Sequence, residues 1–303
     1  MTANPDTKTL DVAHVGALYA VLAYGFWGLL PIFWKFFQGI PAMEVVAHRM
    51  LWSLLFVVGL IAFQRRLPEL RAILRAPRQL LVLLLTALLL TANWGIYVYG
   101  INSDQVVETS LGYFINPLIN VLLGFIFLRE RFNRWQTLAV LLAVLGVGNF
   151  VWSLGTWPWI ALGLGFSFSV YGLLRKLAPA PPLIGLAIET LLLAPVAALA
   201  IFWWAQQGVG TFGHSTTQDL LFLLAGVVTS LPLLWFANAG KRLRFSTLGL
   251  FQYLAPTLQF LLGVFAYGEP FTSAHALTFA LIWTALFLYS GNTLWQRRRV
   301  SPP

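Results

Sequence analysis

Two ionisable side chains stand inside long apolar stretches of the sequence. Arg49 lies about seven residues into the stretch at 42–63, and Glu189 lies about six residues into the stretch at 183–204. If these stretches cross a bilayer, a charge at either position costs at least about 2.5 kcal/mol and normally faces a cavity or a partner. Both residues are therefore candidates for contacting a solute or for proton coupling. The alternatives are snorkelling of Arg49 to the interface and structural hydrogen bonding by Glu189.

A shift of 140 residues places Arg49 and Glu189 at equivalent positions, because it aligns AHRML at 47–51 with AIETL at 187–191. Each lies roughly 10 Å from an opposite surface of a hydrocarbon core about 30 Å thick, which leaves about 10 Å between them along the membrane normal. We therefore expect no direct salt bridge, and expect the two charges to flank a central cavity. His48 is a further candidate because it can titrate near physiological pH, although a neutral histidine bonded to a neighbouring helix fits equally well.

Uncharged polar and aromatic residues complete the candidate set. Asn116 and Asn120 share one helical face. Interhelical hydrogen bonding is the commoner role of such groups, but their occurrence in both halves of the sequence favours a shared cavity. The uncharged candidates for solute binding or coupling are Asn93, Trp94, Asn116, Asn120, Gln252, Tyr253 and Gln259. Prolines in membrane helices free backbone carbonyls and kink the chain, so the hinge candidates are Pro31, Pro117, Pro232 and Pro256.

Motifs for catalysis and metal binding are absent from the sequence. There is no cysteine, no HExxH, no GxSxG and no P-loop pattern, which leaves neither a known hydrolase signature nor a site for driving work by ATP. Glu44 and His48 are four residues apart and could share a metal, but no companion motif supports this. The sequence therefore predicts no catalytic residue, no metal and no cofactor.

The composition is that of a membrane protein. The chain has 303 residues, of which 59% are hydrophobic and 10% are charged, whereas soluble domains have about 25% charged residues. The net charge of +9 falls in short clusters between apolar stretches, so it is better explained by membrane topology than by nucleic acid binding. The expected partners are membrane lipids and a small-molecule substrate.

Ten stretches are long enough to cross a membrane, since a helix needs about 20 apolar residues to do so. The short connections leave no room for a soluble domain, which predicts one all-α membrane unit. The predicted spans are 15–37, 42–63, 80–101, 109–128, 135–152, 157–175, 183–204, 220–239, 246–267 and 274–295.

Basic residues set the orientation, because Lys and Arg are retained on the cytoplasmic side. Seventeen of the nineteen Lys and Arg residues fall in the termini or in the loops on the same side as the termini. Of the other two, Lys35 lies in an opposite loop and Arg49 lies within a span. Both termini are therefore predicted to be cytoplasmic, namely the tail at 1–14 and the basic tail at 296–303.

The sequence also contains an internal repeat. PLINVLLGFIFLRERF at 117–132 aligns with PTLQFLLGVFAYGEPF at 256–271 at an offset of 139 residues, and Glu130 matches Glu269. Both glutamates are interpreted mainly as interfacial capping residues. The predicted repeats are 15–152 and 157–295. Because each holds five spans, the second begins on the opposite side of the membrane, and such inverted repeats are a recurrent transporter design.

Ordered motifs along most of the chain resemble the RarD branch of the EamA transporters, in the drug/metabolite transporter superfamily, a branch often labelled chloramphenicol-sensitive proteins. The motifs include AYGFWGLLPIFWK, EVVAHRMLWS, TSLGYFINPLINVLLG and STLGLFQYLAPTLQFLLGVFAYGEPF. The resemblance implies a ten-helix, inverted-repeat permease of the bacterial plasma membrane with a central cavity. It implies neither a substrate nor a set of binding residues.

These observations predict a secondary transporter of a small metabolite, amino acid or drug-like solute that works by alternating access, with proton coupling as an option. A channel, a lipid scramblase or a structural membrane component is the alternative, and an intramembrane enzyme is a more remote one. The cargo, the direction of transport, the coupling ion and the choice between monomer and homodimer stay open at this stage.

Overall fold

The computed structural model describes residues 5–37, 39–102, 106–154, 157, 159–266 and 273–300, and all regular secondary structure in these residues is helical. Glu269 lies outside these residues. The α-helices are α1 (Pro5–Trp34), α2 (Ala42–Phe63), α3 (Leu67–Leu74), α4 (Pro77–Asn102), α5 (Val106–Phe127), α6 (Arg134–Leu154), α7 (Trp159–Leu177), α8 (Pro182–Gln206), α9 (Thr216–Arg242), α10 (Phe245–Gln252), α11 (Leu254–Leu261) and α12 (Ser273–Val300).

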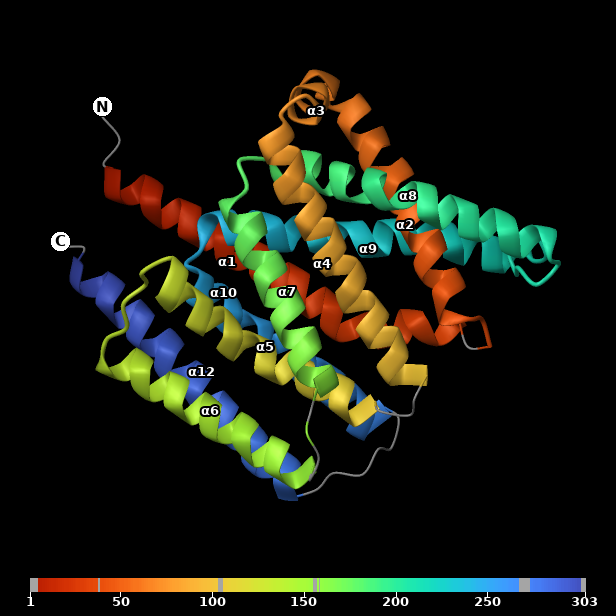
Figure 1. Ribbon diagram of the computed structural model, residues 1–303. Coiled ribbons are helices and arrows are strands. Elements are labelled where there is room, and N and C mark those ends of the chain that lie inside the picture. Colours follow the sequence, from red (N-terminus) through yellow and green to blue (C-terminus); the bar gives the residue numbers. More distant parts are fainter. Residues whose placement is uncertain are drawn as a thin grey trace.

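Helix boundaries follow from local sequence. Pro77 and Pro182 open α4 and α8, where the missing N–H and the preset φ of proline suit the first turn. α2 stops because Arg65 adopts a φ of 56°, and the N–H of Arg66 then donates to the carbonyl of Ile61 at 2.9 Å. This left-handed residue after the helix resembles the usual helix stop. The chain then enters α3, a short helix between α2 and α4 (Figure 1).

Among the described residues, seven helices, α1, α2, α4 and α6 to α9, contain apolar segments long enough to cross a membrane. They coincide with seven of the predicted spans. Shorter apolar segments occur in α5, at Gly112–Phe127, and in α12, at Ala276–Tyr289. The protein is therefore a multi-pass helical membrane protein.

The predicted span at 246–267 is not one continuous helix, which corrects the sequence-based expectation. α10 ends at Gln252, a turn at Tyr253 follows, and α11 leads into a π-helical segment at Leu262–Ala266. Pro256 lies four residues after Gln252 and cannot donate a hydrogen bond to its carbonyl. Of the other hinge candidates, Pro31, Pro117 and Pro232 lie inside α1, α5 and α9, which the structure assigns as uninterrupted helices.

The spacing of glycine and proline differs between α5 and the broken span. SLG at 110–112 and TLG at 247–249 occupy matching places, yet Pro117 follows Gly112 by five residues and Pro256 follows Gly249 by seven. Two additional residues cannot be absorbed by an α-helix of 3.6 residues per turn without rotating one face away from its neighbour.

Helices from the two ends of the sequence pack against each other. α6 lies beside α12, α5 beside α7 and α10, α2 beside α8 and α9, α1 beside α9 and α11, and α4 beside α7 and α8. α6 and α12 form one edge of the molecule, and the beginning of α1 and the end of α12 lie on the same side (Figure 1).

Some of these contacts require glycine. A Cβ placed on Gly226 of α9 would lie 2.4 Å from the backbone carbonyl carbon of Trp52 in α2. At the same crossing the hydroxyl of Ser53 donates to the carbonyl of Gly226 at 3.0 Å. Close approach through a small residue, with a polar side chain as an interhelical link, is the usual means of joining membrane helices.

Candidate functional site

Arg49 lies among aromatic rings from three other helices. Its guanidinium carbon is 4.2 Å from the ring centroid of Trp94 in α4 and 5.2 Å from that of Trp34 at the end of α1. The phenol groups of Tyr97 and Tyr113 also lie within electrostatic range of its charge. Cations favour the faces of aromatic rings, and indole is the best of them. These five residues are called the Arg49 cage below.

The Arg49 cage holds the guanidinium with no ionic partner in the described part of the chain. Within the described residues no acidic side chain forms a salt bridge with Arg49, and its Nε is buried without a hydrogen-bond partner. Other atoms of the cage retain accessible surface: Arg49, Trp34, Trp94 and Tyr113 are half-buried and Tyr97 is 37% exposed. A cage of this kind can accept a ligand against the guanidinium.

Glu189 has a different environment, entirely inside the protein. Its Oε1 lies 3.4 Å from the Nε of Arg175 in α7 and accepts a hydrogen bond from the hydroxyl of Thr86 in α4 at 2.5 Å. The Glu189 and Arg175 side chains are 1% and 2% exposed. Arg175 also donates to the carbonyl of Pro182 at 3.1 Å. The pair therefore ties α4, α7 and α8 together.

Arg175 is one of the seventeen basic residues that the sequence places on the same side as the termini. It lies in the last turn of α7 and is buried. Gly185 makes the space for it, because a Cβ at that position would lie 2.0 Å from one guanidinium nitrogen of Arg175. The sequence did not indicate this role, because an arginine at the end of an apolar segment normally extends its side chain to the lipid headgroups.

His48 is adjacent to Arg49 in sequence but contacts other residues. Its ring lies 4.2 Å from that of Phe222 and 4.9 Å from that of Phe212, both measured between centroids. One turn earlier, Glu44 accepts hydrogen bonds from the backbone N–H and the hydroxyl of Thr211 at 2.6 and 3.0 Å. This part of α2 thus holds the segment between α8 and α9, and His48 packs within that contact.

The predicted asparagines of α4 and α5 face α7. Asn93 donates to the carbonyl of Leu164 and the hydroxyl of Ser167, both at 3.0 Å. Asn116 donates to the carbonyl of Gly165 at 2.7 Å and the hydroxyl of Ser169 at 2.8 Å. Their amide groups link helices of the first half to a helix of the second half.

The amides of the broken span join it to the rest of the bundle. Asn120 donates to the Oε1 of Gln252 at 3.0 Å, and Gln259 donates to the carbonyl of Trp27 at 3.1 Å. Tyr253, at the turn, is fully buried, and its hydroxyl has no hydrogen-bond partner among the described residues. Of the predicted site residues, the structure joins Trp94 to Arg49 and links Asn116, Asn120 and Gln252, because the amide of Asn120 also donates to the Oδ1 of Asn116 at 3.4 Å. The side chains of His48, Asn93, Glu189 and Gln259 contact residues outside the predicted set.

Three cage residues, Trp34, Tyr97 and Tyr113, are not among the predicted site residues, and the sequence offered a specific signal for Tyr113. It lies three residues before Asn116 and therefore on the same face of α5. That spacing was a usable signal, but an aromatic residue in an apolar helix is usually a packing residue.

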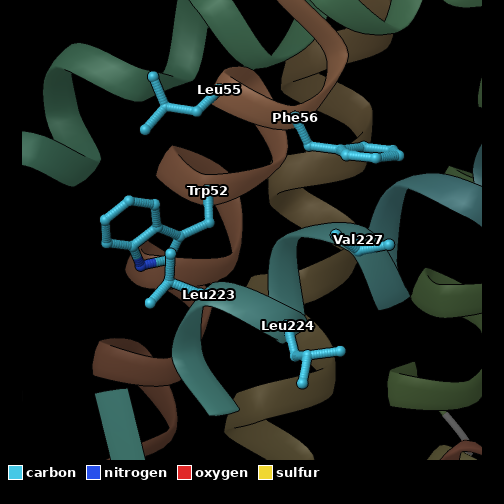
Figure 2. A pocket seen from close by; sticks show the side chains of 6 residues that line it. All are labelled: Trp52, Leu55, Phe56, Leu223, Leu224 and Val227. Atoms are coloured by element: carbon cyan, nitrogen blue, oxygen red, sulfur yellow. The ribbon is translucent and has the colours of Figure 1, made fainter. Parts of the chain in front are cut away.

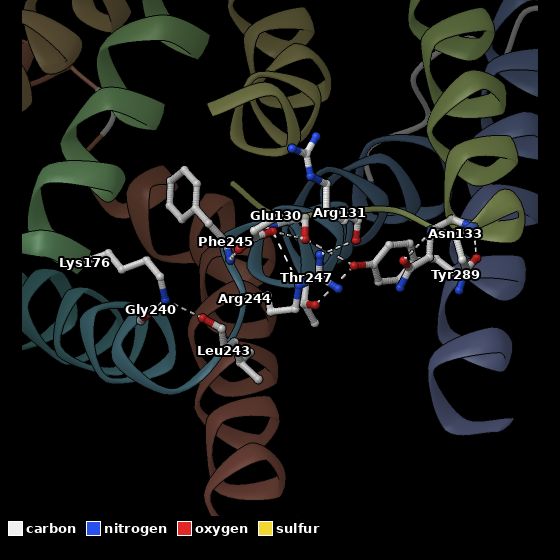
Figure 3. A network of polar contacts seen from close by, with 12 residues as sticks. Glu130, Arg131, Asn133, Lys176, Gly240, Leu243, Arg244, Phe245, Thr247 and Tyr289 are labelled. Atoms are coloured by element: carbon white, nitrogen blue, oxygen red, sulfur yellow. Dashed lines mark hydrogen bonds and ion pairs between the residues drawn. The ribbon is translucent and has the colours of Figure 1, made fainter. Parts of the chain in front are cut away.

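A polar network joins the connection after α5 to the beginning of α10 (Figure 3). The carboxylate of Glu130 accepts hydrogen bonds from the N–H groups of Phe245 and Ser246 at 2.7 and 3.1 Å, and from the Ser246 hydroxyl. This satisfies the free N–H groups of a helix start and places a negative charge at its positive end.

Lysines complete the network at the ends of α7 and α9. Lys176 donates to the carbonyls of Gly240 and Leu243 at 2.6 and 2.5 Å. Lys241 donates to the carbonyls of Lys176 and Ala178. Each helix end is thus capped by a lysine from the other.

An apolar pocket lies between α2 and α9 and is separate from the Arg49 cage (Figure 2). Trp52, Leu55 and Phe56 line one side, and Leu223, Leu224 and Val227 line the other. Its lining contains no ionisable residue, so it offers apolar contact alone.

Apolar helices that cross a membrane several times around buried amides and a caged arginine define a multi-pass membrane protein with a polar interior. Residues 14–151 match the model of the EamA-like transporter family. The chain is 45% identical to Protein RarD of Salmonella typhi, over 94% of this chain and 97% of that protein. It is also 45% identical to a Vibrio cholerae protein called Uncharacterized transporter, over 97% of both.

The chain therefore belongs to the EamA-like transporter family and is of the RarD type, which confirms the resemblance seen in its motifs. A solved structure described as "Crystal structure of protein" has a TM-score of 0.69 over 90% of this chain and 96% of that one. At 19% identity, this likeness concerns the fold alone.

Proposed function

We propose that this protein is a secondary transporter that moves a small metabolite, amino acid or drug-like solute across the bacterial inner membrane by alternating access. The observation that carries the proposal is the pattern of helix pairing, which repeats when the two halves of the chain are exchanged. A protein with two exchangeable halves can open to either side of the membrane in turn.

The exchange assigns α1 to α7, α2 to α8, α4 to α9, α5 to the pair α10 and α11, and α6 to α12. Under this exchange, the contact of α5 with α7 corresponds to the contact of α11 with α1. The contact of α1 with α9 corresponds to the contact of α7 with α4. The exchange turns α2 on α9 into α8 on α4, and it leaves the pairs α2 with α8, α5 with α10 and α6 with α12 unchanged. This supports a two-fold relation between repeats 15–152 and 157–295.

In the proposed topology each repeat has five spans, the second is inverted, and both termini are cytoplasmic. Polar groups lie where the halves meet: Asn93 and Asn116 bond to α7, and Asn120 bonds to Gln252. Interhelical hydrogen bonds of this kind are worth about 0.6 to 2 kcal/mol each, so they can be exchanged between conformations at modest cost. The Arg49 cage, in the first half, is the proposed solute contact.

The test is flux into liposomes that contain the purified protein. A panel of metabolites, amino acids and drug-like solutes is presented with and without a pH gradient, and both solute uptake and proton movement are recorded. Alternating access predicts uptake that saturates and is accelerated by unlabelled solute on the opposite side. A channel or scramblase would give flux that increases in proportion to concentration and lacks this acceleration, and that result would reject the proposal.

A further inference from the structure

The two halves treat an equivalent charged position differently. Arg49 and Glu189 match at an offset of 140 residues, and each stands in the second helix of its repeat. Glu189 has its counter-charge inside the protein, where Arg175 lies 3.4 Å away and both side chains are buried. The repeat also aligns WGLLP at 27–31 with YGLLR at 171–175, so Pro31 occupies the place in the first half that Arg175 has in the second.

Arg49 has no counter-charge among the residues that the structure describes. Its contacts are instead the faces of Trp94 and Trp34, at 4.2 and 5.2 Å. Such contacts stabilise a cation, but they do not supply the opposite charge that a partly desolvated guanidinium favours. An anionic ligand would supply that charge.

We infer that the solute is a small organic anion, whose carboxylate or similar group pairs with Arg49 and whose apolar or aromatic body packs against Trp34 and Trp94. This inference rests on the proposed transport function and adds the chemical class of the cargo. A guanidinium presents a planar fork that matches a carboxylate with two parallel hydrogen bonds. The accessible surface of Arg49 and of the surrounding rings is where such a ligand can make contact.

The cage also distinguishes between charge classes. An amine has no acceptor carboxylate there among the described residues, and it would meet the Arg49 cation instead. A zwitterion such as an amino acid would pair its carboxylate but leave its ammonium group among aromatic faces close to a like charge, which is unfavourable. The expected order of affinity is anion, then zwitterion, then cation, for ligands that share one body.

The experiment measures binding of matched ligands to the purified full-length protein by isothermal titration calorimetry at pH 7. Each set shares one body and differs in charge, as in indole-3-acetate, tryptophan and tryptamine, or 3-phenylpropionate, phenylalanine and phenethylamine. We expect the anions to bind and Arg49→Gln to weaken that binding about 30-fold or more, as expected for removing one partner of a desolvated charge pair. Trp94→Leu should weaken it less. Arg71→Gln is the matched control, because Arg71 is exposed on α3, and it should leave affinity unchanged.

Thermal melting and gel filtration check that each variant is folded, and Arg49→Lys replaces Arg49→Gln if the latter aggregates, with the expectation of a smaller but clear loss of affinity. Equal anion binding by wild type and a folded Arg49 variant would overturn the inference, and so would tighter binding of the amine in each set, or no anion binding. Liposome flux separates the two levels. Flux of neutral or cationic solutes would overturn the anion inference alone, whereas no saturable flux of any charge class would reject the transport function itself.

Discussion

The carboxylate of Glu130 accepts hydrogen bonds from both the backbone N–H and the hydroxyl of Ser246, 116 residues further along the chain. Glu130 follows α5 in the first half of the chain, and Ser246 is the second residue of α10 in the second half. The cap therefore lies between the halves, on the side predicted to be cytoplasmic. Alternating access requires contacts between the halves that can form and break. In this contact the side chain of Glu130 is mostly buried.

Replacing Glu130 by Gln should destabilise the protein by about 1 to 3 kcal/mol, because one acceptor oxygen and the charge at the helix start are both lost. Thermal unfolding in detergent measures the change. Glu69→Gln is the control, since Glu69 pairs with Arg66 on the surface of α3 at 2.7 Å and exposed pairs contribute little. Arg66 lowers the pKa of the Glu69 carboxyl through that hydrogen bond. Equal melting of wild type and Glu130→Gln would contradict the capping role.

A double-mutant cycle should show strong coupling between Arg175 and Glu189. Glu189→Gln leaves a buried guanidinium unpaired, which is expected to cost about 3 to 5 kcal/mol. The variant that combines it with Arg175→Gln should lose less than the sum of the single changes, because no unpaired charge remains. Denaturation of the four proteins under identical conditions gives the coupling. Additive losses would show that the two side chains do not act as a pair.

Gly226→Ala should disturb the crossing of α2 and α9. The new Cβ would lie 2.4 Å from the backbone of Trp52, so the helices must separate, at an expected cost of about 1 to 3 kcal/mol. Gly59→Ala on α2 is the matched control. No described neighbouring atom lies within 4 Å of its added Cβ, and alanine is the better helix former by about 1 kcal/mol. We expect a lower melting temperature for the first variant and an equal or higher one for the second.

Disulfides between the halves should arrest transport reversibly. The natural sequence contains no cysteine, so pairs can be introduced without removing any. In the pair Gly16→Cys and Arg242→Cys, and in the pair Gly112→Cys and Leu164→Cys, the added Cβ of the glycine lies 2.9 Å from the Cβ of its partner, so only small shifts are needed to reach disulfide geometry. Oxidation should stop liposome uptake and a reductant should restore it. Undiminished uptake after complete cross-linking would argue against movement between the halves.

Cysteine labelling tests the orientation. In intact cells, a membrane-impermeant maleimide should label Ser215→Cys, in the exposed segment between α8 and α9. The same reagent should fail to label Arg71→Cys, on the exposed surface of α3, until the membrane is broken. This follows from the retention of basic loops in the cytoplasm. Efficient labelling at position 71 in intact cells would overturn the topology.

Much of the fold is readable from sequence because membrane helices obey simple rules. Length and hydropathy identify the spans, since the bilayer sets a minimum of about 20 apolar residues, and seven predicted spans coincide with long apolar helices. The prediction of one continuous helix at 246–267 was wrong, because hydropathy does not record how residues are spaced around a helix. The interval from Gly249 to Pro256 is two residues longer than the interval from Gly112 to Pro117, and it contains the break between α10 and α11.

The sequence by itself also determined which residues were worth attention, because a charge or amide inside a bilayer is costly and therefore conspicuous. Which partner each one has was decided by tertiary structure alone. Glu189 pairs with Arg175 because α7 and α8 pack closely at Gly185. Arg49, which matches Glu189 in the sequence repeat, instead contacts the indole rings of Trp34 and Trp94. The local sequence shows that a charged residue lies in an apolar segment and is costly to bury. The partner that offsets this cost comes from other helices, which reach it only when the chain folds.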